Sequence, residues 1–149
     1  MQIWVDADAC PGEIKELLFR AAKRTQIRVT LVANQPVRTP RSEFVASLQV
    51  PAGMNVADRR IVELVRPGDL VITADIPLAA QVVAKGGQAL DPRGDLYTDA
   101  NVGERLAVRN LFDELRGGGQ ITGGPANFTA KDRQAFANQL DRWLTAAKN

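Results

Sequence analysis

The sequence predicts an α/β fold of three layers, α/β/α, in which helices cover both faces of a mainly parallel sheet of about five strands. Short apolar runs alternate along the chain with segments whose apolar residues repeat at helical spacing. This alternation is typical of parallel strands that are joined by crossover helices. With 149 residues, 45% of them apolar and 24% charged, the chain has the size and composition of one globular domain.

The first third of the chain predicts a strand, a helix and a second strand. Residues 1–6 form a short apolar run, and Pro11 suits the first position of a helix over residues 11–23. The apolar residues of that helix recur at helical spacing. Residues 28–33 are almost continuously apolar, which indicates a second strand that is buried on both faces.

The middle of the chain continues the alternation. We expect a short third strand at residues 47–50, a helix that Asp58 opens over residues 58–65, and a fourth strand at residues 69–73. Another helix is expected at residues 76–85, and a fifth strand at residues 88–91.

The last third predicts two helices, near residues 101–116 and 129–147. Thr129 and Asp132 have the spacing of a capping box, and an apolar stripe follows them. We expect residues 1–149 to form one domain with a helical extension from about residue 120. The glycines of residues 117–119 and the segment Gly123-Gly124-Pro125 predict a hinge before the last helix.

The composition excludes several classes of protein. The chain has no histidine, so it has neither a Ser-His-Asp nor a Cys-His catalytic group, and no structural zinc site is credible. A single cysteine forms no disulfide within the chain, which together with the absence of a signal peptide predicts a cytoplasmic protein. The apolar runs are too short for a membrane span.

Basic residues are concentrated in the first third of the chain, although the net charge is only +2. They favour a solvated helix face, and a phosphate-binding face is the alternative. These residues are Lys15, Arg20, Lys23, Arg24, Arg28, Arg38 and Arg41.

Four aspartates stand where the predicted elements meet one edge of the sheet. Asp6 and Asp8 follow the first strand, Asp75 follows the fourth, and Asp58 begins the helix before the fourth strand. Two carboxylates spaced by two residues face the same side if the strand continues to Asp8. Clustered carboxylates raise one another's pKa unless a cation compensates, and oxygen ligands select Mg²⁺ or Mn²⁺. Alternatively, Asp8, Asp58 and Asp75 cap the helices that follow them.

Several motifs resemble one known family. The segments VDADACP (residues 5–11), LVITADIPLA (residues 70–79) and ITGGP (residues 121–125), with Val56-Ala57-Asp58 and Asn34-Gln35, are similar to those of the YaiI/YqxD family of uncharacterised bacterial proteins. The resemblance covers nearly the whole chain.

That family is more remotely similar to PIN-domain nucleases, which cut RNA with acidic residues and Mg²⁺ or Mn²⁺. The resemblance implies a PIN-like domain in which Asp6, Asp58 and Asp75 match the acidic positions. A second aspartate at the first strand, Asp8, departs from the PIN pattern, as do the TGGP segment and the last helix.

The leading hypothesis is a metal-dependent phosphodiesterase that acts on RNA. Asp6, Asp8, Asp58 and Asp75 would bind Mg²⁺ or Mn²⁺, with Asp6 and Asp75 as the catalytic residues. We expect the substrate to be contacted by four further residues near the same edge of the sheet. These are Asn34, Gln35, Thr73 and Arg93.

Two other functions remain open. A strand that ends in Asp-x-Asp also opens phosphatases of the haloacid-dehalogenase type, with Asp6 as the nucleophile and Asp8 as the acid–base. A non-catalytic domain that binds a metal or a basic partner is the third hypothesis.

Cys10 is expected to pack or to cap, although the helix start beside it favours a lowered thiol pKa and a reactive thiolate. Trp4 is expected in the core.

Overall fold

The computed structural model of the chain describes residues 1–117 and 127–148, and the predicted hinge lies outside them apart from Gly117. Six strands form one sheet in the order β3-β2-β1-β4-β5-β6. The strands are β1 (Ile3–Asp6), β2 (Val29–Ala33), β3 (Val45–Gln49), β4 (Leu70–Ile72), β5 (Gln88–Leu90) and β6 (Leu96–Tyr97). The helices are α1 (Gly12–Thr25), α2 (Val56–Leu64), α3 (Ile76–Ala84), α4 (Val102–Gly117) and α5 (Ala130–Lys148), and a short 3₁₀ turn spans Ala7–Ala9.

The predicted α/β/α fold with a mainly parallel sheet is confirmed. β1 to β5 pair in parallel, and β6 pairs antiparallel with β5. The sixth strand was not expected, because two residues are too short to show a periodic pattern. β3 begins two residues earlier than predicted. Its burial alternates along the strand, as befits a strand at the edge of a sheet.

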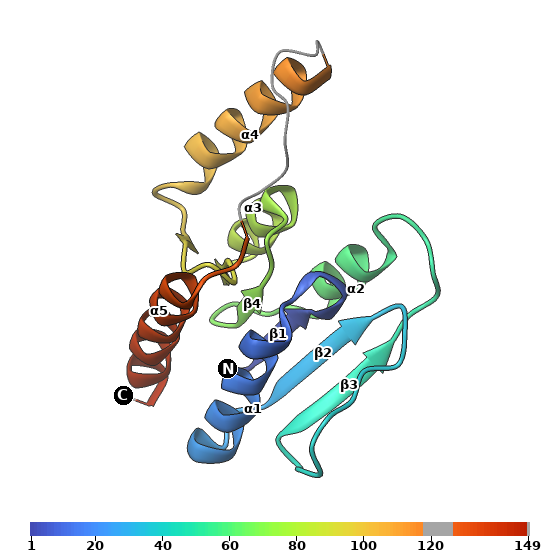
Figure 1. The fold of residues 1–149 in the computed structure, drawn as a ribbon, viewed down its shortest axis with the longest axis vertical. Helices are drawn as coiled ribbons and strands as arrows, with labels where there is room; N and C mark the ends of the chain where they lie inside the picture. The colour runs from blue at the N-terminus through green and yellow to red at the C-terminus, as the bar shows by residue number, and fades with distance from the viewer. Residues whose placement is uncertain (118–126, 149) are drawn as a thin grey trace.

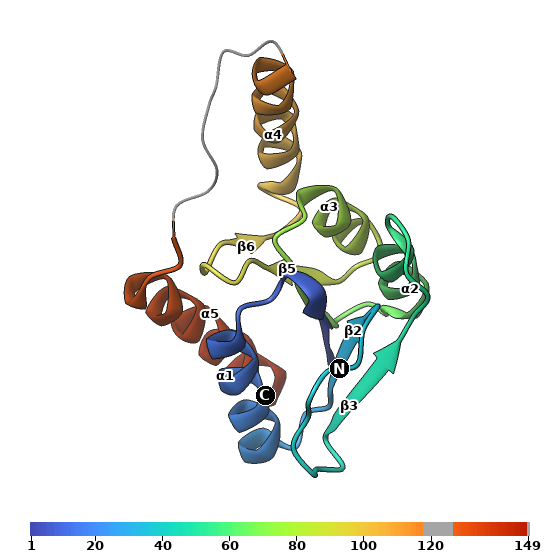
Figure 2. The ribbon, with the colours of Figure 1, turned by 45° about the vertical axis from the view of Figure 1, so that its right-hand side comes forward.

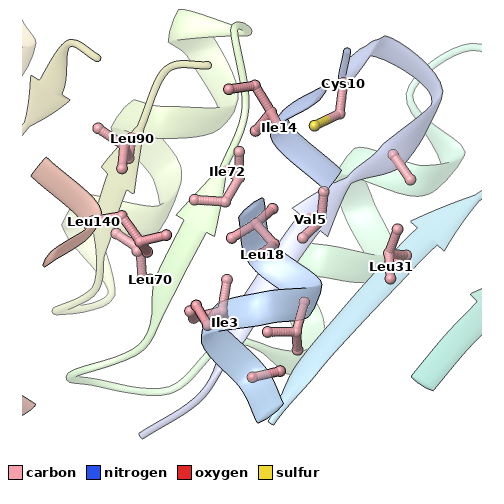
Figure 3. Close-up of a cluster of buried hydrophobic side chains, with 14 of the residues drawn as sticks. Ile3, Val5, Cys10, Ile14, Leu18, Leu31, Leu70, Ile72, Leu90 and Leu140 are labelled. Carbon is pink, nitrogen blue, oxygen red and sulfur yellow. The ribbon is translucent and has the colours of Figure 1, made fainter. Parts of the chain in front are cut away.

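One face of the sheet packs against α1 and α5. Ile3 and Val5 of β1 point to this face, since alternate residues of a strand share a side. They contact the apolar stripe of α1, including Ile14 and Leu18, which Figure 3 shows between the strands and the helix. Figure 2 shows α1 and α5 side by side on this face, and Phe136 of α5 is fully buried in the same cluster.

The opposite face packs against α2 and α3. Trp4 and Val71 point to this side and contact Ile61 of α2 and Leu78 of α3. Trp4 is buried, as predicted, and its indole Nε1 donates to Oδ2 of Asp69 at 3.0 Å. Asp69 is itself buried, and it also accepts hydrogen bonds from the backbone N–H groups of Gln2 and Arg66.

The last helix belongs to the main core. The capping box is formed as predicted, because the N–H of Asp132 donates to Thr129 Oγ1 and the N–H of Thr129 donates to Asp132 Oδ2. Asp132 also pairs with Arg93 at 2.8 Å, which ties the turn between β5 and β6 to the start of α5. Gly94 brings this turn against the backbone of α5, with a φ of +100° that favours glycine.

The helix α4 extends away from the sheet and packs mainly on α3 (Figure 1). Val108, Leu111 and Phe112 are 44%, 55% and 45% exposed along it. Within the described residues, no helix combines the length and the apolar character that crossing a membrane requires.

Candidate functional site

The predicted aspartates lie around the point where the strand order of the sheet reverses. From β1 the chain proceeds to β2 and β3 on one side, and then returns to β4 on the other side of β1. In open parallel sheets, ligands bind outside the carboxyl ends of the strands that flank such a reversal. Asp6 ends β1, and Thr73 immediately follows β4. The fold therefore puts these residues where such sheets bind ligands.

Thr73 connects Asp6 to the start of α3. The register pairs Val5 with Ile72, so Asp6 and Thr73 each stand one residue further along neighbouring strands. The Thr73 hydroxyl donates to Oδ2 of Asp6 at 3.0 Å and accepts a hydrogen bond from the N–H of Asp75, also at 3.0 Å. Thr73 is only 2% exposed, so these two hydrogen bonds hold the Asp6 carboxylate and the Asp75 backbone from the interior of the protein.

Asp75 is the N-cap of α3. Its Oδ1 accepts the N–H of Leu78 at 3.0 Å, which is the capping role that the sequence offered as an alternative. A carboxylate has two oxygens, and capping engages only one of them. Asp75 therefore has a structural role and keeps a second carboxylate oxygen that the cap does not use.

Asp58 lies in the first turn of α2, but it is not the cap of that helix. The N-cap is Asn55, whose φ of +62° is left-handed and whose side chain forms no capping hydrogen bond. Asparagine tolerates this conformation better than most residues. The capping interpretation of Asp58 is therefore wrong, and the Asp58 carboxylate faces Asp75 and Asp6 instead.

Asp8 departs from the predicted arrangement. The strand ends at Asp6, and Ala7–Ala9 forms a 3₁₀ turn, so the alternation that would align Asp8 with Asp6 is broken. Asp8 is exposed, and its Oδ2 accepts the N–H of Asn34 at 2.9 Å. It does not cap α1, whose N-cap is Pro11. Asp8 therefore connects the end of β1 to the end of β2.

Three carboxylates at this edge influence one another electrostatically. Burial raises the pKa of Asp58 to about 6, and the charges of Asp75 and Asp6 and a hydrogen bond shared with Asp75 contribute to that rise. Burial also raises the pKa of Asp6. The Thr73 hydrogen bond opposes that shift, and the charges of Asp75 and Asp8 add to it. We call Asp6, Asp58 and Asp75 the acidic cluster, since their charges are close enough to contribute to the raised pKa values of Asp6 and Asp58.

A cleft of about 330 Å³ opens beside the acidic cluster, between α2, α3 and α4. Asn55, Asp58 and Asp75 line it, together with Arg59 and Arg109. Arg109 pairs with Asp113 at 3.0 Å. Arg59 forms no ion pair within the described part of the chain.

The sequence missed both arginines of the cleft. Arg59 follows Asp58 directly, and that adjacency could have pointed to it. Arg109 has no comparable signal, because only the packing of α4 on α3 brings it to the cleft.

The remaining predicted substrate residues lie away from this cleft. Asn34 and Gln35 follow β2, and Gln35 lines a separate small cavity of about 110 Å³ beside β3. Arg93 lies in the turn between β5 and β6, where it pairs with Asp132 and lies over the ring of Phe128. Of the predicted substrate residues, only Thr73 touches the acidic cluster.

Cys10 is a core residue. It is 8% exposed, and burial raises the pKa of its thiol to about 12, with the charge of Lys15 opposing and that of Asp6 adding to this shift. The expected packing of Cys10 is confirmed, and the alternative of a lowered thiol pKa is wrong, because desolvation outweighs the effect of the helix start.

The donor chemistry of the acidic cluster suits a hard divalent cation, because every candidate ligand is an oxygen. Within residues 1–117 and 127–148, no three side chains of the His, Cys, Asp or Glu type are already grouped as metal ligands. A cation would favour the ionised forms of Asp6 and Asp58, which burial and, to a smaller extent, the neighbouring carboxylates disfavour. The carboxylate oxygens of these residues therefore suit Mg²⁺ or Mn²⁺. The three side chains would have to move closer together to bind one cation.

Comparison with known proteins identifies the family of this chain. Residues 4–146 match the family model described as "Uncharacterized BCR, YaiI/YqxD family". The chain is 63% identical over 146 residues to a UPF0178 protein of Alkalilimnicola ehrlichii, covering 98% of this chain and 99% of the relative. It is 59% identical over 149 residues to a UPF0178 protein of Yersinia pestis, covering 100% and 98%.

No solved structure matches this chain significantly, so the comparisons show no likeness to PIN domains. The family model and the close relatives nevertheless span essentially the whole sequence. The chain belongs to the YaiI/YqxD family of uncharacterised bacterial proteins.

Proposed function

We propose that the acidic cluster binds Mg²⁺ or Mn²⁺ and that the protein hydrolyses phosphodiester bonds, with RNA as the substrate. The observation that carries this proposal is the convergence of Asp6, Asp58 and Asp75 at the reversal of strand order, where burial and the neighbouring carboxylates raise the pKa values of Asp6 and Asp58. Perturbed carboxylates in a cleft are typical of functional sites. Burying neighbouring carboxylates costs the fold free energy, and a bound cation would offset that cost.

The residues of the cluster have separable roles in this proposal. Asp6 and Asp75 would hold the cation, since Thr73 orients the Asp6 carboxylate and the N-cap of α3 fixes that of Asp75. Asp58 would complete the ligand set from α2. When bound, the cation would supply a more acidic water and neutralise charge on a phosphoryl oxygen. This chemistry requires no histidine, and the chain has none.

Arg59 is the residue we propose for binding the substrate phosphate. It lines the cleft next to Asp58 and has no carboxylate partner within the described residues. A guanidinium presents paired N–H donors that match the oxygens of a phosphate. Asn55 lines the same cleft, and its side-chain amide is not used for capping.

The arrangement does not favour the phosphatase alternative. That mechanism needs Asp8 beside Asp6 as an acid–base, whereas the Asp8 carboxylate accepts the N–H of Asn34 from an exposed turn. The non-catalytic alternative predicts a cation site without turnover, and the experiment below separates it from hydrolysis.

The test is cleavage of a labelled single-stranded RNA by purified protein with Mn²⁺ or Mg²⁺. We expect cleavage that a chelator abolishes and that falls at least about a hundredfold in Asp6→Asn and Asp75→Asn. The Asp75→Asn variant keeps a capping side chain at the start of α3, because asparagine and aspartate cap helices about equally well. Arg59→Ala should raise the KM more than it lowers kcat.

Asp99→Asn is the matched control, because it removes an exposed carboxylate between β6 and α4 and should cleave at the unmodified rate. Equal cleavage by the pure Asp6→Asn and unmodified proteins would reject the acidic cluster as the site of hydrolysis. Cation binding without any turnover would reject hydrolysis and support the non-catalytic alternative.

A further inference from the structure

A second pocket lies at the other end of the sheet from the acidic cluster. It has a volume of about 480 Å³ and is formed by the second half of α1 and the segment before β3. Phe44, in its wall, immediately precedes β3, and its carbonyl accepts the N–H of Val29, the first residue of β2. The pocket is therefore at the amino ends of strands whose carboxyl ends point toward the acidic cluster.

Two aromatic rings form an apolar part of this pocket. Phe19 of α1 and Phe44 line it, and both are partly buried against the main core cluster. The core holds their positions while part of each side chain stays open to solvent. Pro40 adds a further apolar surface. A flat apolar ligand bound in this pocket would bury apolar side-chain surface that is otherwise exposed to solvent.

Three cationic side chains line the same pocket as the aromatic rings. Arg20, Lys23 and Arg41 line the pocket and are exposed. None of them pairs with a carboxylate within the described ranges, whereas neighbouring Arg24 pairs with Asp141. Glu43 also lines the pocket and offsets one positive charge. The lining thus carries an excess of two positive charges.

We infer that this pocket binds a nucleotide unit, with the base against Phe19 and Phe44 and the phosphate against Arg20, Lys23 and Arg41. Base stacking on aromatic side chains, combined with a basic rim, is how proteins hold single-stranded nucleic acids. The volume is within the range of small-ligand sites. The inference is independent of the proposed hydrolysis, because the pocket shares no residue with the acidic cluster.

Binding to the full chain tests the inference without any cleavage. The probes are a fluorescent short oligoadenylate, measured by anisotropy in the presence of a chelator, and adenosine monophosphate and inorganic phosphate as competitors. In Arg20→Glu/Arg41→Glu, we expect affinity for the strand to fall about tenfold or more. Phe19→Leu/Phe44→Leu, which keeps apolar packing but removes both rings, should lower it about tenfold.

The matched control is Lys131→Glu/Arg142→Glu, which makes the same change in net charge on exposed positions of α5. It should retain affinity within about twofold. An equal loss in the control, or none in Arg20→Glu/Arg41→Glu, overturns the pocket as the binding site. Adenosine monophosphate should compete much better than inorganic phosphate, and equal competition overturns the role of the aromatic rings. Thermal melting of each variant verifies that it is folded.

Discussion

Thr73 illustrates how one buried hydroxyl organises the candidate site. It donates to the Asp6 carboxylate and accepts from the backbone N–H of Asp75, so it ties the end of β1 to the start of α3. Its 2% exposure means that water cannot replace either hydrogen bond. The sequence indicated that Thr73 would face this side. Its twofold role depends on the pairing of β1 with β4, which no local pattern specifies.

Thr73→Val should therefore destabilise the protein by about 1–3 kcal/mol, because it leaves the Asp75 N–H and an Asp6 oxygen without their partner. The pKa of Asp6 should rise further, since the Thr73 hydrogen bond is what lowers it. Urea denaturation measures the first effect, and carboxyl NMR titration measures the second. Thr73→Ser keeps the hydroxyl, and an equal rise in the pKa of Asp6 in this variant would contradict the role of the hydrogen bond.

Asp58 should make the protein less stable as pH rises. Its pKa is about 6 in the folded state, against an ordinary value of 3.8, so the folded protein binds the proton more tightly. Stability is then greatest below 3.8 with respect to this group and is lost as the pH rises toward about 6.

Asp58→Asn should remove most of that loss and raise the melting temperature at neutral pH. Thermal melts across this pH range measure the effect, with Asp99→Asn as the comparison that should keep the unmodified profile. A melting temperature for Asp58→Asn that falls at neutral pH, relative to the unmodified protein, would contradict a destabilising Asp58 carboxylate.

At the scale of elements, the contact between the β5–β6 turn and α5 depends on Gly94. A Cβ atom at this position would lie 2.6 Å from the Cβ of Ala135 and 2.7 Å from its carbonyl carbon, and the φ is +100°. Gly94→Ala should cost about 1–3 kcal/mol of stability, because both backbone strain and overpacking oppose it. Chemical denaturation provides the measurement.

Gly103→Ala is the control for that substitution, because a Cβ at Gly103, in the first turn of α4, meets nothing within 4 Å. It should be neutral or slightly stabilising, since alanine favours the helix. Equal destabilisation of the two variants would mean that the turn does not pack on α5 as described.

The elements differ in how far the sequence could predict them. The predictions for α1, β2 and α3 are within a few residues of the observed bounds, because continuous apolar character or helical spacing marks each one. β6 was missed because its pairing with β5, rather than its own two residues, makes it a strand. The predicted third strand was displaced by two residues at its start because only Val45 of this edge strand is buried, and no long run of apolar residues marks where the strand begins.

The residues of the candidate site also differ in how far the sequence could predict them. The convergence of Asp6 and Asp75 was predictable because the carboxyl ends of parallel strands share an edge of the sheet, and Asp58 was predictable from its place at the start of the helix before β4. The alignment of Asp8 with Asp6 failed because the strand ends before it. Arg109 could not be predicted, because it reaches the cleft only through the packing of α4 on α3.

At the scale of the whole molecule, two polar regions lie at opposite ends of one sheet. The acidic cluster follows the carboxyl ends of β1 and β4, and the basic aromatic pocket precedes β3 and flanks α1. The helix α1 returns from the carboxyl end of β1 to the amino end of β2, and so spans the two ends of the sheet (Figures 1 and 2). This separation lets cation binding and nucleotide binding be tested by different variants of a single protein.

Calorimetric titration of Mn²⁺ into the purified protein at neutral pH tests the central claim most directly. The proposal predicts saturable binding that is lost in Asp6→Asn and Asp75→Asn and retained in Asp8→Asn, because Asp8 lies in an exposed turn beside Asn34. Binding of equal affinity in the unmodified protein and in Asp75→Asn, or no binding to the unmodified protein, would contradict a cation site at the acidic cluster.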